Sequence, residues 1–199
     1  KKYNNNKIIK IICVARIHPR KGQDKLLHSL IDLPIKIQSN LVVYFAGPII
    51  DEKFFKSVRI LSNNFEGKVI FEGDCSDQKL AFLYSDSDIF ALTPMEMKNS
   101  IEGFGLVYME ASSFGLPVIA NRTGGIQDAV LENKTGIIAD PQNLNSLTEA
   151  FDRLITDHKL RKKLGENGKK WAKSHNWQKV SNDFYSFTRE HPQILDAND

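Results

Sequence analysis

The chain has 199 residues, with 27 Lys and Arg against 24 Asp and Glu, and a formal net charge of +3. A hydrophobic fraction of 41% with so small a net charge excludes an intrinsically disordered chain. Two cysteines, Cys13 and Cys75, are too few for a disulfide framework and indicate a reducing compartment. No apolar run approaches the roughly 18 residues that a membrane-spanning helix needs. The length is enough for a domain that buries a core of its own.

Short apolar segments alternate along the chain with segments of helical character. We expect strands at 8–14, 41–46, 68–72, 88–92, 117–120 and 136–139. We expect helices at 23–31, 51–63, 77–85, 105–114 and 126–131, the third of them capped by Ser76. The strands are apolar throughout, which is typical of strands covered on both faces. The pattern predicts an α/β fold, a doubly wound parallel sheet of the Rossmann-like type.

The last part of the chain differs from the rest. Residues 143–190 contain no convincing strand and are predicted to form consecutive extra helices, the first capped by Asn143 or Asn145. We expect breaks between these helices at Gly165, at Gly168 and near residues 174–177.

The segment 159–173 carries seven Lys and Arg residues. It fits a solvated helix face with Leu160, Leu164 and Trp171 turned inward, and it also fits a basic helix in peripheral contact with an anionic membrane. The thin apolar stripe favours the solvated face.

Ligands of open parallel sheets bind beyond the carboxyl ends of the strands, so the turns there are the candidate site. The turn at 15–22 contains neither GxGxxG nor a Walker A motif, but it places Arg16, Arg20 and Lys21 beside Gly22, just before a helix. Cations beside a helix N-terminus form an anion site. The alternative, to which we give equal weight, is that these three residues are ordinary exposed charges near the start of a helix.

The turn after the fourth predicted strand contains Glu102, and Glu110 follows it in the next helix. Gly103 and Gly105 would let the backbone approach a ligand, and the free N–H groups of residues 104–107 would hold a phosphate. A carboxylate at Glu110 would accept hydrogen bonds from vicinal hydroxyls, such as those of a ribose. The alternative is a glycine-rich turn with two solvated Glu residues.

The turn after the fifth predicted strand ends in Gly124 and Gly125. These residues fit a second backbone-amide site or merely a tight strand-to-helix connection. Taken together, the turns describe a cradle for a diphosphate with carboxylates for sugar hydroxyls, which is the chemistry of a nucleotide-sugar site.

At these residues the sequence resembles the retaining glycosyltransferases of family 4. The resemblance is carried by the run from Arg16 to Gly22, by EGFGLVYME and by GLPVIANRTGGIQDAV, and it covers roughly residues 8–190. It implies the C-terminal half of a GT-B fold, and the pattern is most similar to that of bacterial mannosyltransferases. Ala15 stands where the family often has Gly, and the Gly47-Pro48 turn is poorer in Gly than is usual, which leaves the role of that turn open.

The resemblance assigns roles to individual residues. Arg16 and Lys21 match the basic pair at the donor diphosphate, Glu102 the carboxylate at the donor sugar, and Glu110 the ribose ligand. The remaining implied donor-binding residues are, at the base, the turn of Gly73, Asp74, Cys75 and Ser76 and, near the phosphates, Gly103, Phe104, Gly105, Leu106 and Val107. No metal and no cofactor is implied, and UDP-, GDP- and ADP-sugars all remain open as donor.

The implied activity is hexose transfer from the nucleoside diphosphate sugar to a hydroxyl of a lipid or glycan. We expect a linker at 1–7, the donor-binding domain at 8–174, and a helix at 175–199 that crosses to an N-terminal acceptor domain outside this chain. The isolated fragment is expected to be inactive, and its location cytoplasmic or at the inner face of the membrane.

Two other functions remain open at this point. The first is a non-catalytic nucleotide-sugar-binding regulatory module of the same fold, and the second is an epimerase or phosphorylase of the same architecture. The presence of both Glu residues and both cations argues against the first. A nucleic-acid partner is disfavoured, because the cations do not interleave with aromatic residues along one face.

Overall fold

The computed structural model describes residues 8–96, 103 and 105–175, in which six strands form one parallel sheet. The strands are β1 (Ile9–Val14), β2 (Leu41–Ala46), β3 (Lys68–Gly73), β4 (Ile89–Leu92), β5 (Val118–Asn121) and β6 (Gly136–Ala139). Their order across the sheet is β3-β2-β1-β4-β5-β6. Every predicted strand is present within one residue of its expected ends, and the Rossmann-like fold is confirmed.

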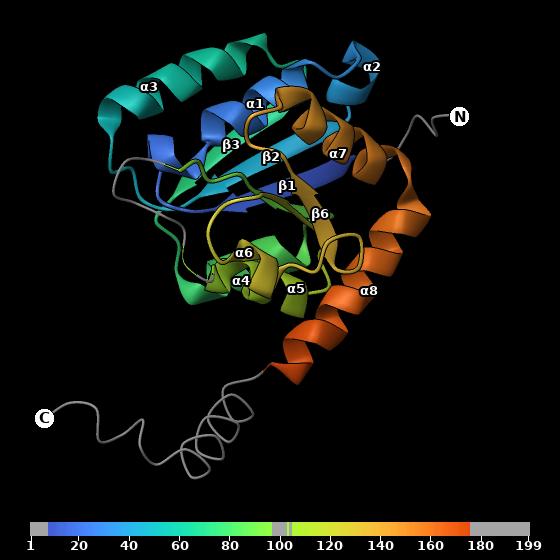
Figure 1. Cartoon of the computed structure of the whole chain (residues 1–199). Helices are drawn as coiled ribbons and strands as arrows, with labels where there is room; N and C mark the ends of the chain where they lie inside the picture. The colour runs from blue at the N-terminus through green and yellow to red at the C-terminus, as the bar shows by residue number, and fades with distance from the viewer. Residues whose placement is uncertain (1–7, 97–102, 104, 176–199) are drawn as a thin grey trace, which may run out of the picture.

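Helices cover both faces of the sheet (Figure 1). One layer contains α1 (Gln23–Ile31), the short α2 (Ile35–Gln38), α3 (Glu52–Leu61) and α7 (Leu144–Thr156). The other contains α4 (Asp77–Ser85), α5 (Leu106–Ser113) and α6 (Ile126–Ala129), with α8 (His158–Ser174) packed against α5. The short α2 and the 3-10 turns Pro19–Lys21 and Ser62–Asn64 were not predicted. Ser76 caps α4, as expected, by accepting a hydrogen bond from the Lys79 N–H at 3.3 Å.

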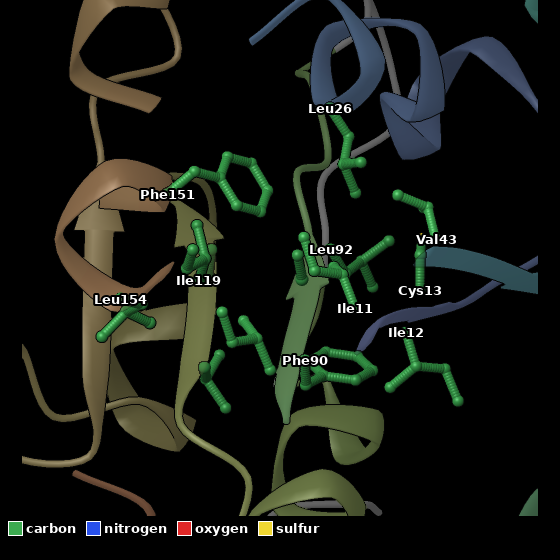
Figure 2. Packing of buried hydrophobic residues seen from close by; sticks show 14 of the residues in the cluster. Ile11, Ile12, Cys13, Leu26, Val43, Phe90, Leu92, Ile119, Phe151 and Leu154 are labelled. Atoms are coloured by element: carbon green, nitrogen blue, oxygen red, sulfur yellow. The ribbon is translucent and has the colours of Figure 1, made fainter. Parts of the chain in front are cut away.

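The core lies on both faces of the central strands, which explains why those strands are apolar throughout. Figure 2 shows Ile11 and Ile12 of β1 beside Phe90 of β4, with Phe151 of α7 over the outer strands. All four of these side chains are inaccessible to solvent. Burial of such side chains contributes about 1.5–3 kcal/mol each to folding, so β1 and β4 are held at the centre of the molecule.

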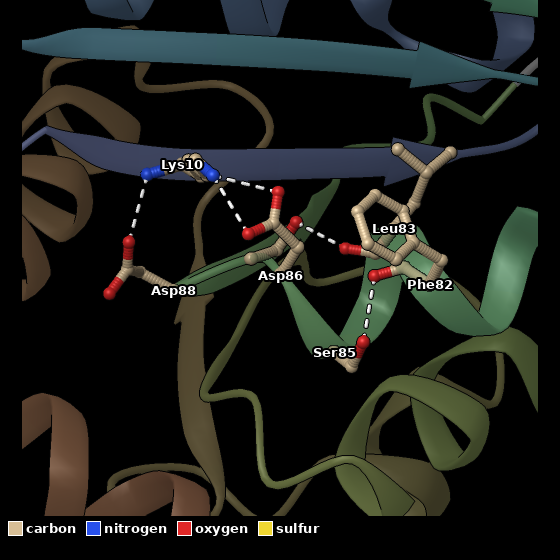
Figure 3. A network of polar contacts seen from close by, with 7 residues as sticks. Lys10, Phe82, Leu83, Ser85, Asp86 and Asp88 are labelled. Atoms are coloured by element: carbon tan, nitrogen blue, oxygen red, sulfur yellow. Dashed lines mark hydrogen bonds and ion pairs between the residues drawn. The ribbon is translucent and has the colours of Figure 1, made fainter.

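A polar network joins β1 to the connection between α4 and β4 at the amino edge of the sheet (Figure 3). The Lys10 ammonium lies 2.7 Å from an Asp86 carboxylate oxygen, and the Lys10 backbone N–H donates to Asp88 at 3.0 Å. The hydrogen bond to Asp86 is the main cause that raises the pKa of Lys10, so the ammonium keeps its charge at neutral pH. These contacts lie at the edge opposite to the predicted site and therefore act on the fold.

The C-terminal helices correct one prediction. Gly165 and Gly168 do not break the chain but lie inside α8. A Cβ atom at Gly165 would be 2.0 Å from the Gly115 carbonyl oxygen, so the glycine permits close approach of α8 to the loop after α5. Asn143, one of the two expected caps, does cap α7.

The inward stripe expected on α8 is confirmed. Leu164 is buried, Leu160 packs against the core, and the Trp171 indole N–H donates to the Ala129 carbonyl at 3.2 Å. Arg161, counted among the solvated charges, is instead buried and donates to the Leu154 and Ile155 carbonyls. The expected linker at 1–7 and nearly all of the expected crossing helix at 175–199 lie outside the described residues.

Candidate functional site

The strand order reverses between β1 and β4, which makes the carboxyl ends of these two strands the topological switch point of the sheet. The β1 turn (residues 15–22) and the β4 turn (residues 93–105, of which 97–102 and 104 lie outside the described residues) both begin there. The sequence predicted that these turns together form one cradle, but not the contacts by which they meet.

The two turns interlock around Gly22. Gly22 has a left-handed φ of 69°, and a Cβ atom there would be 2.0 Å from the Thr93 carbonyl oxygen, so only glycine fits. The Thr93 hydroxyl donates to the Gly22 carbonyl at 2.9 Å, and the Met95 N–H donates to the Arg20 carbonyl at 2.8 Å. His18 caps the 3-10 turn by accepting from the Arg20 N–H at 3.1 Å. The cations of the β1 turn are thus carried on a fixed backbone.

Two buried amides fix these turns further, and neither was predicted. The Gln23 side chain is fully buried and donates to the Arg16 carbonyl at 2.9 Å. Asn121 at the end of β5 donates to the Thr93 and Pro94 carbonyls, each at 3.2 Å. A polar residue ending the apolar run VIAN is the one sequence signal that pointed to Asn121.

A cleft of about 190 Å³ opens at the carboxyl ends of β1, β2 and β3. Its described lining residues are Val14, Ala15, Arg16, Ala46, Gly47, Pro48, Asp74, Cys75 and Leu80. The predicted Arg16 therefore lies in one cleft with the predicted Asp74 and Cys75, although they come from different turns. The guanidinium is exposed at this cleft, where it would be accessible to an anion.

The Gly47-Pro48 turn, whose role the sequence left open, forms part of the cleft wall. A Cβ atom at Gly47 would be 2.3 Å from the Ala15 carbonyl oxygen, and the Gly47 N–H donates to the Gly73 carbonyl at 2.7 Å. The turns after β1, β2 and β3 are therefore in mutual contact, with the predicted Gly73 at their junction.

Lys21 lies half-buried in the β1 turn, and its positive charge acts on the pKa of the Cys13 thiol in β1. Burial raises the pKa of Cys13 to about 12, while Lys21 opposes that shift. Burial is also the main cause that raises the pKa of Cys75 at the cleft. Both thiols are neutral at physiological pH, which argues against a cysteine nucleophile at this site.

The predicted phosphate-binding helix is α5, which begins at Leu106 after Gly105. Its N-cap residue is Gly105, which has no side chain to cap the helix, and among the described residues no side chain accepts from the N–H groups of Leu106 and Val107 in its first turn. Leu106 itself is exposed, and Val107 packs against the core. Glu102 and Phe104 lie outside the described residues.

Glu110 is the fifth residue of α5, and its side chain is exposed. One of its carboxylate oxygens accepts a hydrogen bond from the Tyr84 hydroxyl of α4 at 3.2 Å. Glu110 is not among the described residues of the cleft wall, but Leu80, one helical turn before Tyr84, is. Glu110 is therefore held beside the helix that forms one wall of the cleft.

The glycine pair after β5 acts as a tight connection. A Cβ atom at Gly125 would be 3.2 Å from the Gly103 carbonyl oxygen, so the β5 turn lies directly against the β4 turn. The helix that follows, α6, has only four residues. This geometry favours the second of the two interpretations of Gly124 and Gly125.

A larger cavity, of about 500 Å³, lies over the carboxyl ends of β4, β5 and β6. Its described lining consists of Met95, Glu96, Arg122, Asp140, Pro141 and Gln142. The Arg122 guanidinium is paired with Glu132 at 2.8 Å. Arg122 lies within the motif GLPVIANRTGGIQDAV, but neither it nor the other residues of this lining was predicted as a site residue.

No group of three or more His, Cys, Asp or Glu within the described residues could hold a metal ion. No helix in the same part of the chain has the length and apolar character to cross a membrane.

Comparison with known proteins places these features in context. The family described as "Glycosyl transferases group 1" matches residues 1–171. A curated relative from Mycolicibacterium smegmatis, named GDP-mannose-dependent alpha-(1-6)-phosphatidylinositol monomannoside mannosyltransferase, is 30% identical over 174 residues. That match covers 84% of this chain and 44% of the relative, so the chain spans less than half the length of the relative.

Solved structures share the fold. Anabaena HepE, in a complex with UDP and glucose, superposes with a TM-score of 0.76 at 21% identity, covering 90% of this chain and 49% of that one. The C-terminal domain of a glycosyl transferase group 1 family protein from Francisella tularensis gives a TM-score of 0.72 at 24% identity, covering 84% of this chain and 85% of that one. The GT-B Rossmann-like architecture implied by the resemblance is therefore confirmed.

Proposed function

Because this chain belongs to the glycosyl transferases group 1 family, we propose that it is the donor-binding domain of a retaining hexosyltransferase. It would bind a nucleoside diphosphate sugar along the carboxyl edge of its sheet. The observation that carries the proposal is the cleft at the ends of β1, β2 and β3, where Arg16 lies with Asp74 and Cys75.

The parts of the donor match the parts of this edge. The base would occupy the cleft against residues 73–76, and the diphosphate would lie between Arg16, Lys21 and the N-terminus of α5. The ribose would extend past Leu80, at the wall of the cleft, to the Glu110 carboxylate beside α4. Glu102 remains the residue proposed for the donor sugar.

GDP-mannose is the first donor to test. The choice of base rests here on the curated mycobacterial relatives, whose names specify GDP-mannose. The structural neighbour HepE has been crystallised with UDP and with UDP-glucose, so UDP-sugars are the matched competitor.

The proposed chemistry needs little from the protein besides charge. The bond between the anomeric carbon and the diphosphate oxygen breaks, and the acceptor oxygen bonds to that carbon on the same face. The acceptor proton passes to the leaving diphosphate. Arg16, Lys21 and the α5 N–H groups would stabilise the charge that develops on the diphosphate, without a metal ion.

We place the acceptor site in a further domain of the full-length protein, and the larger cavity over β4–β6 would face that acceptor. The exposed lysines of α8 would allow peripheral contact with an anionic membrane, by charge alone, since the apolar stripe of α8 is packed inward.

Calorimetric titration of the chain with GDP, UDP and ADP and with their mannose or glucose conjugates tests the proposal. We expect one nucleotide to bind at least tenfold more tightly than the others, and Glu110→Ala to weaken it. Glu149→Ala on α7, which is not part of the proposed site, is the matched control and should leave affinity unchanged. Absence of binding to every nucleotide would contradict the donor-binding role.

A further inference from the structure

We propose that Tyr84 is a positioning residue, which holds the Glu110 carboxylate in the orientation that recognises the two vicinal hydroxyls of the donor ribose. The inference rests on the proposed function, because it assumes that Glu110 meets the nucleotide. It assigns a task to a buried hydroxyl that sequence reasoning did not single out.

The contact between Tyr84 and Glu110 is direct and gives the two carboxylate oxygens different roles. The Tyr84 hydroxyl donates to Glu110 Oε2 at 3.2 Å. The other oxygen, Oε1, has no hydrogen bond within the part of the chain that the structure describes. An exposed glutamate would otherwise lose side-chain entropy on binding a ligand, and the anchored Oε2 removes part of that cost beforehand.

Tyr84 can hold Glu110 because its own ring is immobilised. The side chain is 2% exposed, stacks on Phe114 with centroids 5.2 Å apart, and lies 6.2 Å from Phe90. A phenylalanine would make the same ring contacts. The hydrogen bond to Glu110 is the one contact of the described structure that requires the hydroxyl.

The position of Tyr84 links Glu110 to the cleft. Tyr84 follows Leu80 by four residues on α4, so the two side chains lie on one face of that helix. Leu80 is part of the cleft wall, and Glu110 is attached one turn further on. A nucleoside whose base enters the cleft would therefore reach Glu110 with its sugar.

The hydroxyl also stays a donor. Burial, followed by the charge of Glu110, raises the pKa of Tyr84 far above its ordinary value. The phenol therefore keeps its proton at neutral pH, and Glu110 keeps the acceptor role that a ribose needs.

The test compares a nucleotide with its analogue that lacks both ribose hydroxyls. Calorimetry measures GDP and 2′,3′-dideoxy-GDP (or the corresponding pair of the preferred base) with the wild-type chain, Tyr84→Phe and Tyr44→Phe. Tyr44 on β2 supplies the matched control, because its hydroxyl makes no described contact with Glu110 or the cleft.

We expect the wild type to prefer the ribose form by about tenfold or more, because a charged carboxylate accepts its hydroxyls. Tyr84→Phe should weaken the ribose form by roughly fivefold and leave the dideoxy form unchanged. In a Glu110→Ala background, where the acceptor of the Tyr84 hydroxyl is gone, the same change should have little further effect. Tyr44→Phe should alter neither.

Other results overturn the inference at identifiable steps. If Tyr84→Phe weakens binding of the ribose and the dideoxy nucleotide equally, Tyr84 has a purely structural role. If it weakens binding of neither nucleotide, Tyr84 has no role in the site. If the wild type binds both forms equally, Glu110 does not meet the ribose and this part of the proposed function fails as well. If neither form binds, the donor-binding function itself fails.

Discussion

Lys21 belongs to a turn whose backbone is held in place by several independent contacts. Fixed charge of this kind stabilises a leaving group without reorganisation during the reaction. In the catalytically competent protein, Lys21→Ala should lower kcat on the order of 10²-fold, by analogy with removal of one transition-state donor. Steady-state kinetics would measure this, with Lys25→Ala on the exposed part of α1 as the control. Near-wild-type turnover of Lys21→Ala would remove this lysine from the mechanism.

Cys75 offers a chemical probe of the cleft. Burial raises the pKa of its thiol, so the thiolate fraction near pH 8 is smaller than that of a free thiol. Alkylation by iodoacetamide, followed by mass spectrometry, should therefore be slow at pH 8 and accelerate as the pH rises. The donor nucleotide should slow it further, because Cys75 lines the cleft. Alkylation that is indifferent to a saturating nucleotide would place the base elsewhere.

Cys13 is the internal reference for that experiment. Its thiol is 1% exposed, and its pKa of about 12 keeps it protonated. It should stay unmodified until the chain unfolds, and the Cys75→Ser variant should then show no modification in the native state.

At the scale of elements, close backbone contacts join helices to loops. The strongest case is α8, where Gly165 lies against the Gly115 carbonyl and Gly168 lies 3.3 Å, measured from an added Cβ, from the Ser112 hydroxyl oxygen. Replacing glycine by alanine inside an exposed helix would ordinarily stabilise it by about 0.5–1 kcal/mol. The outcome here depends on what the new methyl group meets.

We expect Gly165→Ala to lower the free energy of unfolding by about 1–3 kcal/mol, because the contact is with backbone that cannot move aside. Gly168→Ala should be close to neutral, since its neighbour is the end of a side chain. Urea denaturation followed by circular dichroism measures both. Equal effects of the two substitutions would contradict the packing of α8 against the α5 loop.

The α8 helix illustrates why part of the fold was not predictable. Glycine within a helical pattern ordinarily indicates a break, and the pattern does not reveal that a carbonyl from residue 115 lies against position 165. Arg161 was treated as solvated for the same reason, whereas its guanidinium satisfies the last carbonyls of α7. The first error concerns a contact between segments far apart in the chain. The second concerns a contact across the bend between α7 and α8.

At the scale of the whole molecule, a bound donor should stabilise the folded chain. A ligand that binds only the native state at a hundred times its Kd adds about 2.7 kcal/mol. The melting temperature should therefore rise with the preferred nucleotide and depend on its concentration, as scanning fluorimetry can measure. Arg16→Ala should reduce that rise while leaving the melting temperature of the free chain nearly unchanged, since the Arg16 side chain is exposed.

Some residues of the candidate site could likewise be predicted from the local sequence, whereas others depend on contacts that only the folded chain makes. Arg16 and Lys21 could be proposed from the composition of their turn, and Asp74 and Cys75 only from the family resemblance. Asn121 and Tyr84 could not, since each acts by a hydrogen bond to a segment that only the folded chain brings near, and Gln23 could not because its bond to Arg16 depends on the exact path of the β1 turn.

The sequence by itself determined the six strands, the layers that cover them and the turns that carry the cations. It did so because continuous apolar segments must be covered on both faces and because turn residues have local preferences. Only the tertiary structure decided that the β1 and β4 turns interlock at Gly22, that three turns enclose the cleft, and that α4 holds Glu110. Strand order sets these neighbours, and strand order depends on packing between distant segments, which no local pattern of residues contains.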